Sequence, residues 1–332
     1  MTPSRLRKPR DLPVLDVDLA GRTVLVVGCN TGLGLETMKH FARMRPKRLV
    51  GTCRDEEKCA QTEKVIKEET GFEDVLCWPL ELTSFASVKC FTARFEHYGD
   101  GCLDIMILNA AMATLEYGLT ADGFESTVQV NHLSGALLSL LLLRTLLQTA
   151  YRHKTTSRLV IVSSGVHQDV HFGPNNMPEG KGVLETLSSE AGSSVMQQRY
   201  HETKLLNILF TRALQAHLPL NSPLLVTAVD PGFSLSSRVR QDMEKQPDEF
   251  REVLEFARTA EEGSRQIVYG ALGPKDQKKW EKLRGAYVSD NEVKEPSQWV
   301  RSREGRVVQK MVWNETLSIL SGVDARIAEL IR

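Results

Sequence analysis

A tyrosine and a lysine stand four residues apart in the segment RYHETK, at Tyr200 and Lys204. If this segment is helical, the two side chains lie on the same face. A free tyrosine has a pKa of about 10, and a nearby ammonium group lowers that pKa because it favours the phenolate. Such a pair could exchange a proton with a bound substrate near neutral pH. Alone, each residue has a simpler interpretation, a core tyrosine and a solvated surface lysine.

Three glycines, Gly28, Gly32 and Gly34, stand in the segment GCNTGLG. They follow the apolar segment TVLVVG directly and precede the helix-like segment ETMKHFARM. A dinucleotide pyrophosphate must come close to backbone amides and a helix N-terminus, and glycine leaves room for that approach. Any tight strand-to-helix turn also favours glycine, so the spacing GxxxGxG alone is weak evidence. Its place between a first strand and a helix predicts dinucleotide binding.

The charge that follows the second apolar segment distinguishes the two nicotinamide dinucleotides. The sequence there reads Cys53, Arg54, Asp55. An acid at this position would hydrogen-bond the ribose 2′-hydroxyl of NAD, whereas an arginine would pair with the 2′-phosphate of NADP. Arg54 therefore favours NADP(H) over NAD(H). The alternative is an ordinary surface arginine, and the neighbouring Asp55 keeps that alternative open.

Six short apolar segments alternate with helix-like segments and would position these residues. Because they lack polar alternation, they predict strands buried on both faces, as in a parallel sheet with helical crossovers. We expect an α/β fold, a single Rossmann-type doubly wound parallel sheet with helices on both faces. Ligands of such sheets bind beyond the carboxyl ends of the strands. The six segments are Thr23–Gly28, Arg48–Cys53, Val75–Leu80, Leu103–Ala110, Arg158–Ser164 and Leu224–Asp230.

The chain outside these elements divides into a tail and two long insertions. Residues 1–18 are expected to form a basic, solvated and partly disordered tail, and residues 19–332 one domain. Insertions near residues 165–198 and 234–256 follow the fifth and sixth strands. Long insertions at the ligand end of a sheet are usually functional or mobile. We interpret both as walls of a substrate pocket, the alternative being peripheral decoration.

Composition argues against several other classes of protein. Lysine plus arginine equals aspartate plus glutamate, 42 against 42, so nucleic acid and anionic membranes are not expected partners. Six cysteines without a CxxC pair argue against a disulfide framework or a metal site and for a reducing, cytoplasmic location. The most apolar run, Ala136 to Leu147, is shorter than the roughly 18 residues of a membrane span. It favours a buried helix or a helix at a subunit interface. We expect no secretory signal and no membrane anchor.

Six motifs fall in one order along the chain: GCNTGLG, LNAA, VNHL, VSS, RYHETK and DPGF. This order resembles the short-chain dehydrogenase/reductase superfamily. The most similar branch is the retinol-dehydrogenase-like reductases, which includes many fungal reductases of secondary metabolism. The resemblance runs from about Leu19 to near the C-terminus. It includes the segment RTAEEGSRQIVYGAL, which is similar to a late helix of that branch.

The resemblance implies a role for each matching residue. The catalytic tetrad would be Asn131, Ser164, Tyr200 and Lys204, in a mechanism that needs no histidine and no metal. Lys204 would also bind the nicotinamide ribose, and Asn131 would hold a water linked to Lys204. Further implied cofactor contacts surround the glycine loop and the strand ends. They are Gly28, Asn30, Thr31, Gly32, Leu33, Gly34, Arg54, Glu81, Leu82, Asn109, Tyr200, Pro231, Gly232 and Ser236.

Three departures from the family pattern matter. The usual NNAG is LNAA, so a small residue has become Ala111, and the aspartate expected after the third strand is Glu81. The second change puts the contact with the adenine edge in doubt. The gap from Ser164 to Tyr200 is longer than usual, which suggests a larger or differently covered substrate pocket. His132, His167, His171 and His201 lie near these motifs and are interpreted as structural or substrate-facing.

The resemblance implies an NADP(H)-dependent oxidoreductase that interconverts a ketone or aldehyde and an alcohol. We expect a small, apolar organic substrate, for example a polyketide or terpenoid secondary metabolite. Two alternatives stay open: a non-catalytic NADP-binding regulator or scaffold, and the same fold carrying out double-bond reduction or epimerisation. A homodimer or homotetramer is expected through the helices near LLSLLLLRTLL and RYHETKLLNILF, whose apolar faces agree with it.

Overall fold

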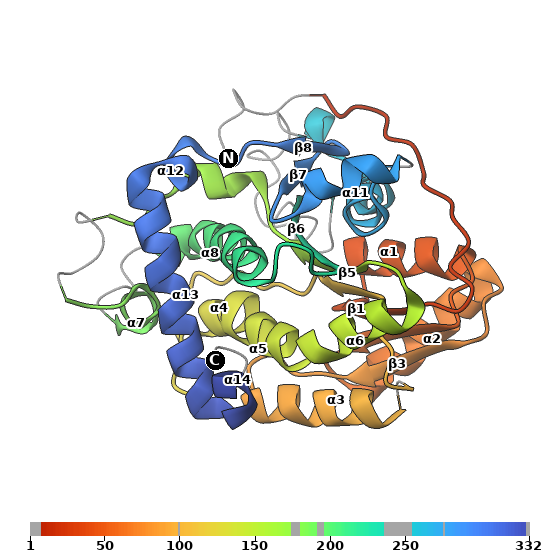
Figure 1. Ribbon diagram of the computed structural model, residues 1–332, viewed down its shortest axis with the longest axis horizontal. Helices are drawn as coiled ribbons and strands as arrows, with labels where there is room; N and C mark the ends of the chain where they lie inside the picture. Colours follow the sequence, from red (N-terminus) through yellow and green to blue (C-terminus); the bar gives the residue numbers. More distant parts are fainter. Residues whose placement is uncertain are drawn as a thin grey trace.

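The structure, a computed structural model, describes residues 8–98, 100–173, 180–190, 196–235, 254–274 and 276–329. Its centre is an eight-stranded sheet in the order β3-β2-β1-β4-β5-β6-β7-β8 (Figure 1). All neighbours pair in parallel except β7 and β8, which are antiparallel. The expected doubly wound sheet is confirmed. The strands are β1 Thr23–Val27, β2 Arg48–Cys53, β3 Val75–Pro79, β4 Ile105–Leu108, β5 Ser157–Val162, β6 Leu224–Asp230, β7 Tyr287–Ser289 and β8 Glu292–Lys294.

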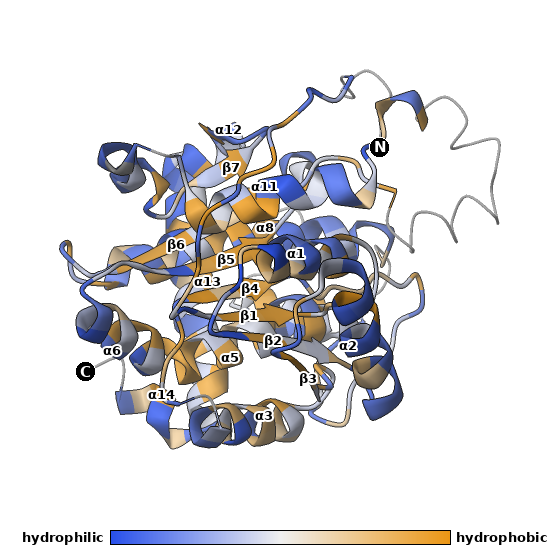
Figure 2. Cartoon of the chain, turned by 90° about the vertical axis from the view of Figure 1, so that its right-hand side faces the viewer, coloured by the Kyte–Doolittle hydropathy of each residue, from blue (hydrophilic) through white to orange (hydrophobic). Residues whose placement is uncertain are grey.

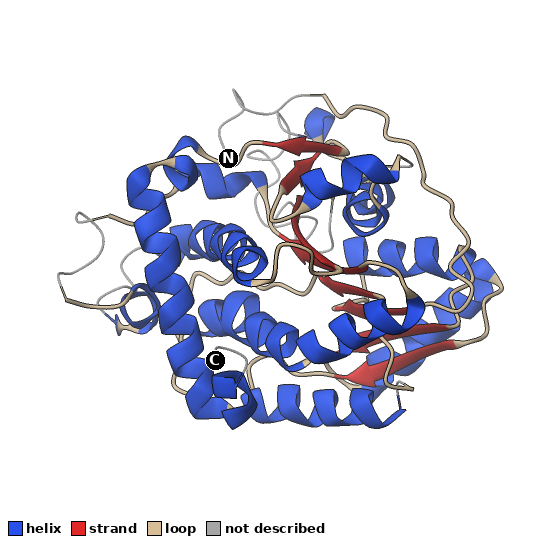
Figure 3. Cartoon of the chain, viewed as in Figure 1, coloured by secondary structure: helices blue, strands red, loops and turns tan. Residues whose placement is uncertain are grey.

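Helices cover both faces of the sheet, as Figure 3 shows. One layer holds α1 (Gly32–Arg43), α2 (Glu56–Thr70) and α11 (Ala260–Leu272), and a hydrophobic cluster joins it to the sheet. The opposite layer holds α3 (Phe85–Tyr98), α5 (Ser134–Leu141), α6 (Leu143–His153), α8 (Met196–His217) and α13 (Arg303–Val323), over a second cluster. Shorter pieces are α4 (Ser126–Val128), α7 (Val183–Ser188), α12 (Gln298–Arg301) and α14 (Ala325–Glu329).

The central strands are apolar because both of their faces lie in the core. Every residue of β1, β4, β5 and β6 is buried. Figure 2 shows these apolar strands in the interior, between helices whose outer surfaces are hydrophilic. Burial on both faces places the chemistry at the strand ends, because the strands themselves carry almost no accessible polar side chain.

The sheet has two more strands than the six expected from the sequence. Strands β7 and β8 have three residues each, too few for a hydrophobic pattern. They form a hairpin whose turn residues, Asp290 and Asn291, have φ angles of 54° and 55°. Positive φ at both turn residues is typical of a two-residue hairpin loop, and Asp and Asn tolerate it. The pair DN was therefore a signal for this hairpin.

The N-terminal segment is less solvated than expected in the part that the structure describes. Leu12 is buried, and its carbonyl accepts a hydrogen bond from Arg265 Nη1 at 2.6 Å. The Arg10 carbonyl accepts one from Arg258 Nη1 at 2.7 Å, and the Arg10 side chain pairs with Glu292. These contacts fasten the segment to α11 and β8.

The leucine-rich run folds into α5 and α6, whose leucines pack in the core. Leu137, Leu138 and Leu146 are completely buried, and Arg144 is exposed, so the expected buried helix is confirmed. No single helix in the described part of the chain has the length and apolar character to cross a membrane. One bent pair, Ser126–Leu141 with Leu143–His153, meets both criteria jointly, with 45° between its halves.

The apolar face of α8 is also used within the chain. Leu205, Leu206 and Leu209 are completely buried in the cluster that α8 shares with α13. These residues were part of the reason for expecting a subunit interface. Because one chain already covers them, they give no support to an oligomer.

The two insertions are described only in part. The first contains a 3₁₀ turn, Gly165–Asp169, and helix α7, followed by the start of α8. Helix α7 is anchored to α13, since Glu315 accepts hydrogen bonds from the N–H groups of Leu184 at 3.0 Å and Glu185 at 2.8 Å. Most of the second insertion, residues 236–253, lies outside the described residues.

Candidate active site

The glycine loop joins β1 to α1 in a turn that only glycine fits. Gly28 has a φ of 82°, and a Cβ there would lie 2.6 Å from the Cβ of Ala110. A Cβ on Gly34 would collide with the Gly28 carbonyl oxygen. Gly32 begins α1 with a φ of 57°. The loop therefore brings the first amides of α1 to the carboxyl edge of the sheet, an arrangement suited to an anion.

Asn109 fixes this loop from the end of β4. Its Nδ2 donates to the Gly28 carbonyl at 2.7 Å. On the other side, the Gly28 N–H donates to Thr52 Oγ1 at 3.1 Å. Asn109 thus ties the loop to the neighbouring strands, and Ala111 in place of the family glycine leaves that bond intact. Thr52 is a contact that the sequence motifs did not indicate.

Arg54 and Asp55 follow β2 and have different surroundings. Asp55 is the N-cap of α2, accepts a hydrogen bond from the Lys58 N–H at 2.8 Å and pairs with the Lys58 ammonium. The side chain of Arg54 is exposed, and the structure shows no ion pair between it and a described residue. Asp55 is therefore engaged by the helix, which leaves Arg54 as the charge available to a ligand.

Glu81 and Leu82 follow β3 at the same edge. The Glu81 carboxylate accepts a hydrogen bond from the Thr83 N–H at 2.9 Å, and the Glu81 N–H donates one to Ser87 Oγ at 2.9 Å. Glu81 thus stabilises the turn into α3, and Leu82 is buried beside it. The contact of both residues with a cofactor stays a prediction.

Lys204 is buried on α8 with its ammonium directed at the sheet. Its Nζ donates to the Val162 carbonyl of β5 at 2.7 Å and lies 5.4 Å from the centre of the half-buried Tyr200 ring. Burial lowers the pKa of Lys204 to about 8, and the negative charge of Asp230 opposes that shift. The ammonium therefore lies within the protein beside the Tyr200 ring, and not in bulk solvent.

Ser164 lies two residues after β5 and is the N-cap of the 3₁₀ turn Gly165–Asp169, which packs against α8. Its carbonyl accepts a hydrogen bond from His167 Nδ1 at 2.7 Å, while His167 Nε2 accepts one from the Ser297 N–H at 3.2 Å. Burial lowers the pKa of His167, so this histidine is neutral and holds the turn in place. The motifs gave His167 no specific role, and its partner Ser297 is far away in the sequence.

Asn131 lies in a π-helical turn, Gln129–Leu133, between α4 and α5. Its side chain bonds both backbone groups of Met112, at 2.7 and 2.8 Å, and donates to Thr203 Oγ1 at 3.0 Å. Thr203 in turn donates to the Tyr200 carbonyl at 2.8 Å. Thr203, which no motif singled out, thus connects Asn131 to the helix of Tyr200. Such π turns occur often at functional sites.

A small cavity of about 20 Å³ lies next to this group. Its lining includes the polar residues Asn131 and Asn207 together with Val162, whose carbonyl binds Lys204. That volume is enough for about one water molecule.

The turn after β6 contains Pro231 and Gly232, and Gly232 has a φ of 76°. Asp230 holds the turn, since its carboxylate accepts hydrogen bonds from the Gly232 N–H at 2.9 Å and from Tyr287 Oη at 2.9 Å. Ser236, the implied contact of the nicotinamide carboxamide, lies outside the described residues.

The remaining histidines differ in their surroundings. His132 is completely buried, its Nε2 lies 2.9 Å from Thr316 Oγ1, and burial lowers its pKa to about 3. It is therefore neutral and structural. His201 faces Asp169 at 3.8 Å, and the ring of His171 lies against that of Trp299.

Comparisons with known proteins agree with this architecture. The profile of the short chain dehydrogenase family matches residues 22–175. Short chain dehydrogenase sol3 of Alternaria solani is 34% identical over 285 residues, which cover 86% of this chain and 94% of that protein. Retinol dehydrogenase 11 of Homo sapiens is 36% identical over 230 residues, 68% of this chain and 64% of that one. The chain belongs to the short-chain dehydrogenase/reductase family and is an oxidoreductase of that family.

The fold also matches solved structures. Actinorhodin polyketide ketoreductase with NADPH superposes with a TM-score of 0.59 at 19% identity, over 82% of this chain and 96% of that one. At this identity the likeness concerns the fold alone.

Proposed function

We propose that the protein is an NADP(H)-dependent reductase of a ketone or aldehyde, which also catalyses the reverse oxidation of the alcohol. The observation that carries this proposal is the position of the Lys204 ammonium, which is buried, bonded to β5 and 5.4 Å from the Tyr200 ring. A buried ammonium beside a phenol favours release of the phenolic proton, which is what a carbonyl oxygen requires as it becomes an alcohol.

Four residues of this chain have distinct roles in the proposed reaction. Ser164 hydrogen-bonds the substrate oxygen, and Tyr200 donates the proton to it. Lys204 stabilises the resulting phenolate. Asn131 positions a water in the cavity of about 20 Å³, and this water passes a replacement proton towards Lys204. General acid catalysis of this kind typically contributes about 10²–10⁴-fold.

The chain fits a dinucleotide at the edge of the sheet. Gly28 and Gly34 leave a cradle that a Cβ would fill, and the amides that open α1 suit a pyrophosphate. Arg54 suits a 2′-phosphate, because Asp55 is engaged as a helix cap. When bound, the nicotinamide cofactor supplies the hydride. A solved neighbour of the same fold is described as binding NADPH.

The proposed substrate class rests on two observations. The solved neighbour that is named a polyketide ketoreductase supports a small, apolar organic substrate such as a polyketide or another secondary metabolite. The long segment between Ser164 and Tyr200 would form part of the pocket wall. We also propose a cytoplasmic location.

Tyr200→Phe separates this proposal from a non-catalytic scaffold. The variant should still bind NADPH and lose at least about 10²-fold in NADPH consumption on a panel of ketones and aldehydes, because the acid is removed. A wild-type protein that binds NADPH and turns over no carbonyl would support the scaffold. With deuterated NADPH, the label should appear at the carbinol carbon of the product. Label elsewhere would indicate double-bond reduction.

A further inference from the structure

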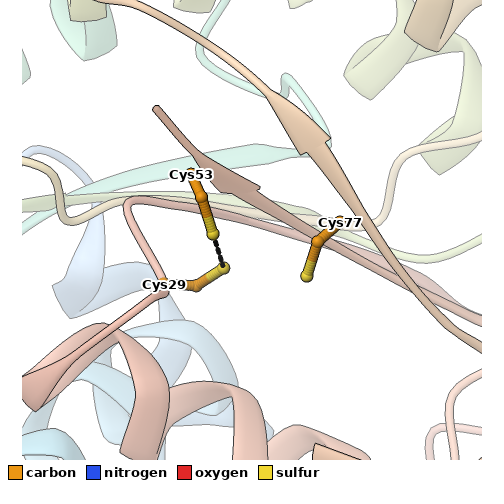
Figure 4. Close-up of side chains that lie close together, drawn as sticks. All are labelled: Cys29, Cys53 and Cys77. Atoms are coloured by element: carbon orange, nitrogen blue, oxygen red, sulfur yellow. Dashed lines mark hydrogen bonds between the residues drawn. The ribbon is translucent and has the colours of Figure 1, made fainter. Parts of the chain in front are cut away.

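Three thiols come together at the glycine loop, one from the loop itself and two from the neighbouring strands β2 and β3. Figure 4 shows Cys29 in the loop, Cys53 at the end of β2 and Cys77 in β3. Their sulfur atoms lie within 4.8 Å of one another, and those of Cys29 and Cys53 are 3.9 Å apart. All three are buried and reduced. They come together over Gly51, where a Cβ would collide with Cys29 Sγ and lie 3.0 Å from Cys77 Sγ.

Backbone pairing decides which two thiols could form a bond. The Cys29 N–H donates to the Thr52 carbonyl at 3.0 Å, which in a parallel ladder makes Cys29 the neighbour of Cys53. Neighbouring strands are about 4.8 Å apart, within the Cα separation of about 4.4–6.8 Å that a disulfide needs. Cys77 is the partner of Gly51 on β3, so it is two strands from Cys29 and two residues out of register with Cys53. Both separations exceed about 7 Å, the reach of a disulfide.

We propose that Cys29 and Cys53 form a reversible disulfide when the protein meets a peroxide, and that this disulfide weakens NADP(H) binding. The second half of the proposal rests on the proposed function, since it takes the glycine loop as the pyrophosphate site.

The oxidation has two steps and consumes one peroxide. Hydrogen bonds from the Cys29 and Cys77 thiols lower the pKa of Cys53 against the effect of burial, so Cys53 is the first nucleophile. Its thiolate attacks one peroxide oxygen, the O–O bond breaks, and a sulfenic acid and water form. The Cys29 sulfur then attacks the Cys53 sulfur, the S–O bond breaks and a second water leaves. Two electrons pass from the sulfurs to the peroxide, and a dithiol reductant reverses the change.

The effect on the cofactor follows from which element can move. The sulfurs must close from 3.9 Å to a bond of about 2.05 Å. β2 is held along its length by both β1 and β3. The glycine loop is held mainly by Asn109 and Thr52. The loop therefore moves, and the amides of Asn30 and Thr31 move with it. Such a movement weakens the hydrogen bonds of these amides to the pyrophosphate, and each hydrogen bond to a charged group contributes about 1.5–3 kcal/mol, which is about tenfold or more in affinity.

The test uses the purified full chain, reduced and then freed of reductant. Hydrogen peroxide is added with and without NADPH. Free thiols are counted, disulfides are mapped in unreduced peptides by mass spectrometry, and the Kd for NADPH is measured by its fluorescence. Cys29→Ala removes one partner. Cys90→Ala, at the exposed thiol of α3, is the matched control.

We expect a Cys29–Cys53 peptide, an NADPH Kd raised about tenfold or more, recovery with dithiothreitol, and slower oxidation when NADPH is bound. Cys90→Ala should behave like wild type. The NADPH Kd of Cys29→Ala should not change when peroxide is added. Absence of the Cys29–Cys53 peptide, or its presence with an unchanged Kd, overturns the proposal, and the wild-type map alone decides this if Cys29→Ala does not fold. If the reduced protein does not bind NADPH at all, the proposed function fails, while the peptide map still tests the disulfide.

Discussion

At the scale of single residues, the proposed preference for NADP(H) rests on two neighbours of opposite charge. Asp55 could have hydrogen-bonded a ribose hydroxyl, but it caps α2 and pairs with Lys58. An acid committed to a helix N-terminus is stabilised there and is not available to a ligand without cost to the helix. Arg54 has no such engagement among the described residues. The sequence alone could not separate these two side chains, because their roles depend on where α2 begins.

Arg54→Ala should raise the KM for NADPH about 10- to 100-fold, since a hydrogen bond to a charged group contributes about 1.5–3 kcal/mol. The KM for NADH should change little, because that cofactor has no 2′-phosphate. Steady-state kinetics with both cofactors measure the ratio. Lys58→Ala is the control, as it removes a nearby positive charge that pairs with Asp55. An equal rise in KM for NADPH and NADH would show that Arg54 does not contact the 2′-phosphate.

At the scale of elements, a buried ionic group joins α4, which leads into the turn of Asn131, to α8, which carries Tyr200 and Lys204. Arg199, next to Tyr200 on α8, is completely buried and lies 3.6 Å from Glu125 and 3.4 Å from Glu202. Glu125 also caps α4 through the N–H groups of Thr127 and Val128. Since α4 leads into the π turn of Asn131, the group fixes that turn relative to α8. A buried charge that loses one partner costs more than the pair contributes.

Arg199→Met should lower the free energy of unfolding by about 3 kcal/mol, because it leaves the buried carboxylates of Glu125 and Glu202 without their cation. Glu125→Gln should lower it by less, because Arg199 keeps Glu202 as a partner. The double variant should be less destabilised than the sum of the two, with a coupling of roughly 1–3 kcal/mol. Denaturant unfolding of the four proteins measures the cycle. Additivity within about 0.5 kcal/mol would mean that the two side chains do not interact.

At the scale of the whole molecule, sequence patterns predict what is local and miss what is distant. The strands Arg48–Cys53 and Leu224–Asp230 could be placed to the residue, because long apolar runs have one stable location in such a sheet. The glycine loop and the tetrad could be named from motifs. The contact of His167 with Ser297 could not, because it joins residues 130 positions apart. Leu12 gave no signal either, since a single leucine in a basic segment has no periodicity.

The final prediction concerns the cost of keeping an ammonium group in the core. Burial lowers the pKa of Lys204 from 10.5 to about 8. Below about pH 8 Lys204 is protonated in both the folded and the unfolded chain. The folded state is then destabilised by the full free-energy cost of desolvating the ammonium. Between about pH 8 and 10.5 the unfolded chain binds more protons than the folded one, and this contribution to the free energy of unfolding rises with pH.

Lys204→Met should therefore be more stable than wild type at pH 7, without cofactor, while losing activity. The shift corresponds to at most about 3 kcal/mol, and loss of the bond to Val162 offsets roughly 1 kcal/mol. Denaturant unfolding from pH 7 to 10 should show this advantage shrinking as the pH rises. Lys39→Met, at a buried lysine paired with Glu36 and Glu69, should instead destabilise the protein. An advantage that stays constant with pH would show that the proton on Lys204 is not its source. The added stability of Lys204→Met would then come from better packing of the methionine. The argument that the core holds a charged lysine for proton transfer would lose its thermodynamic support.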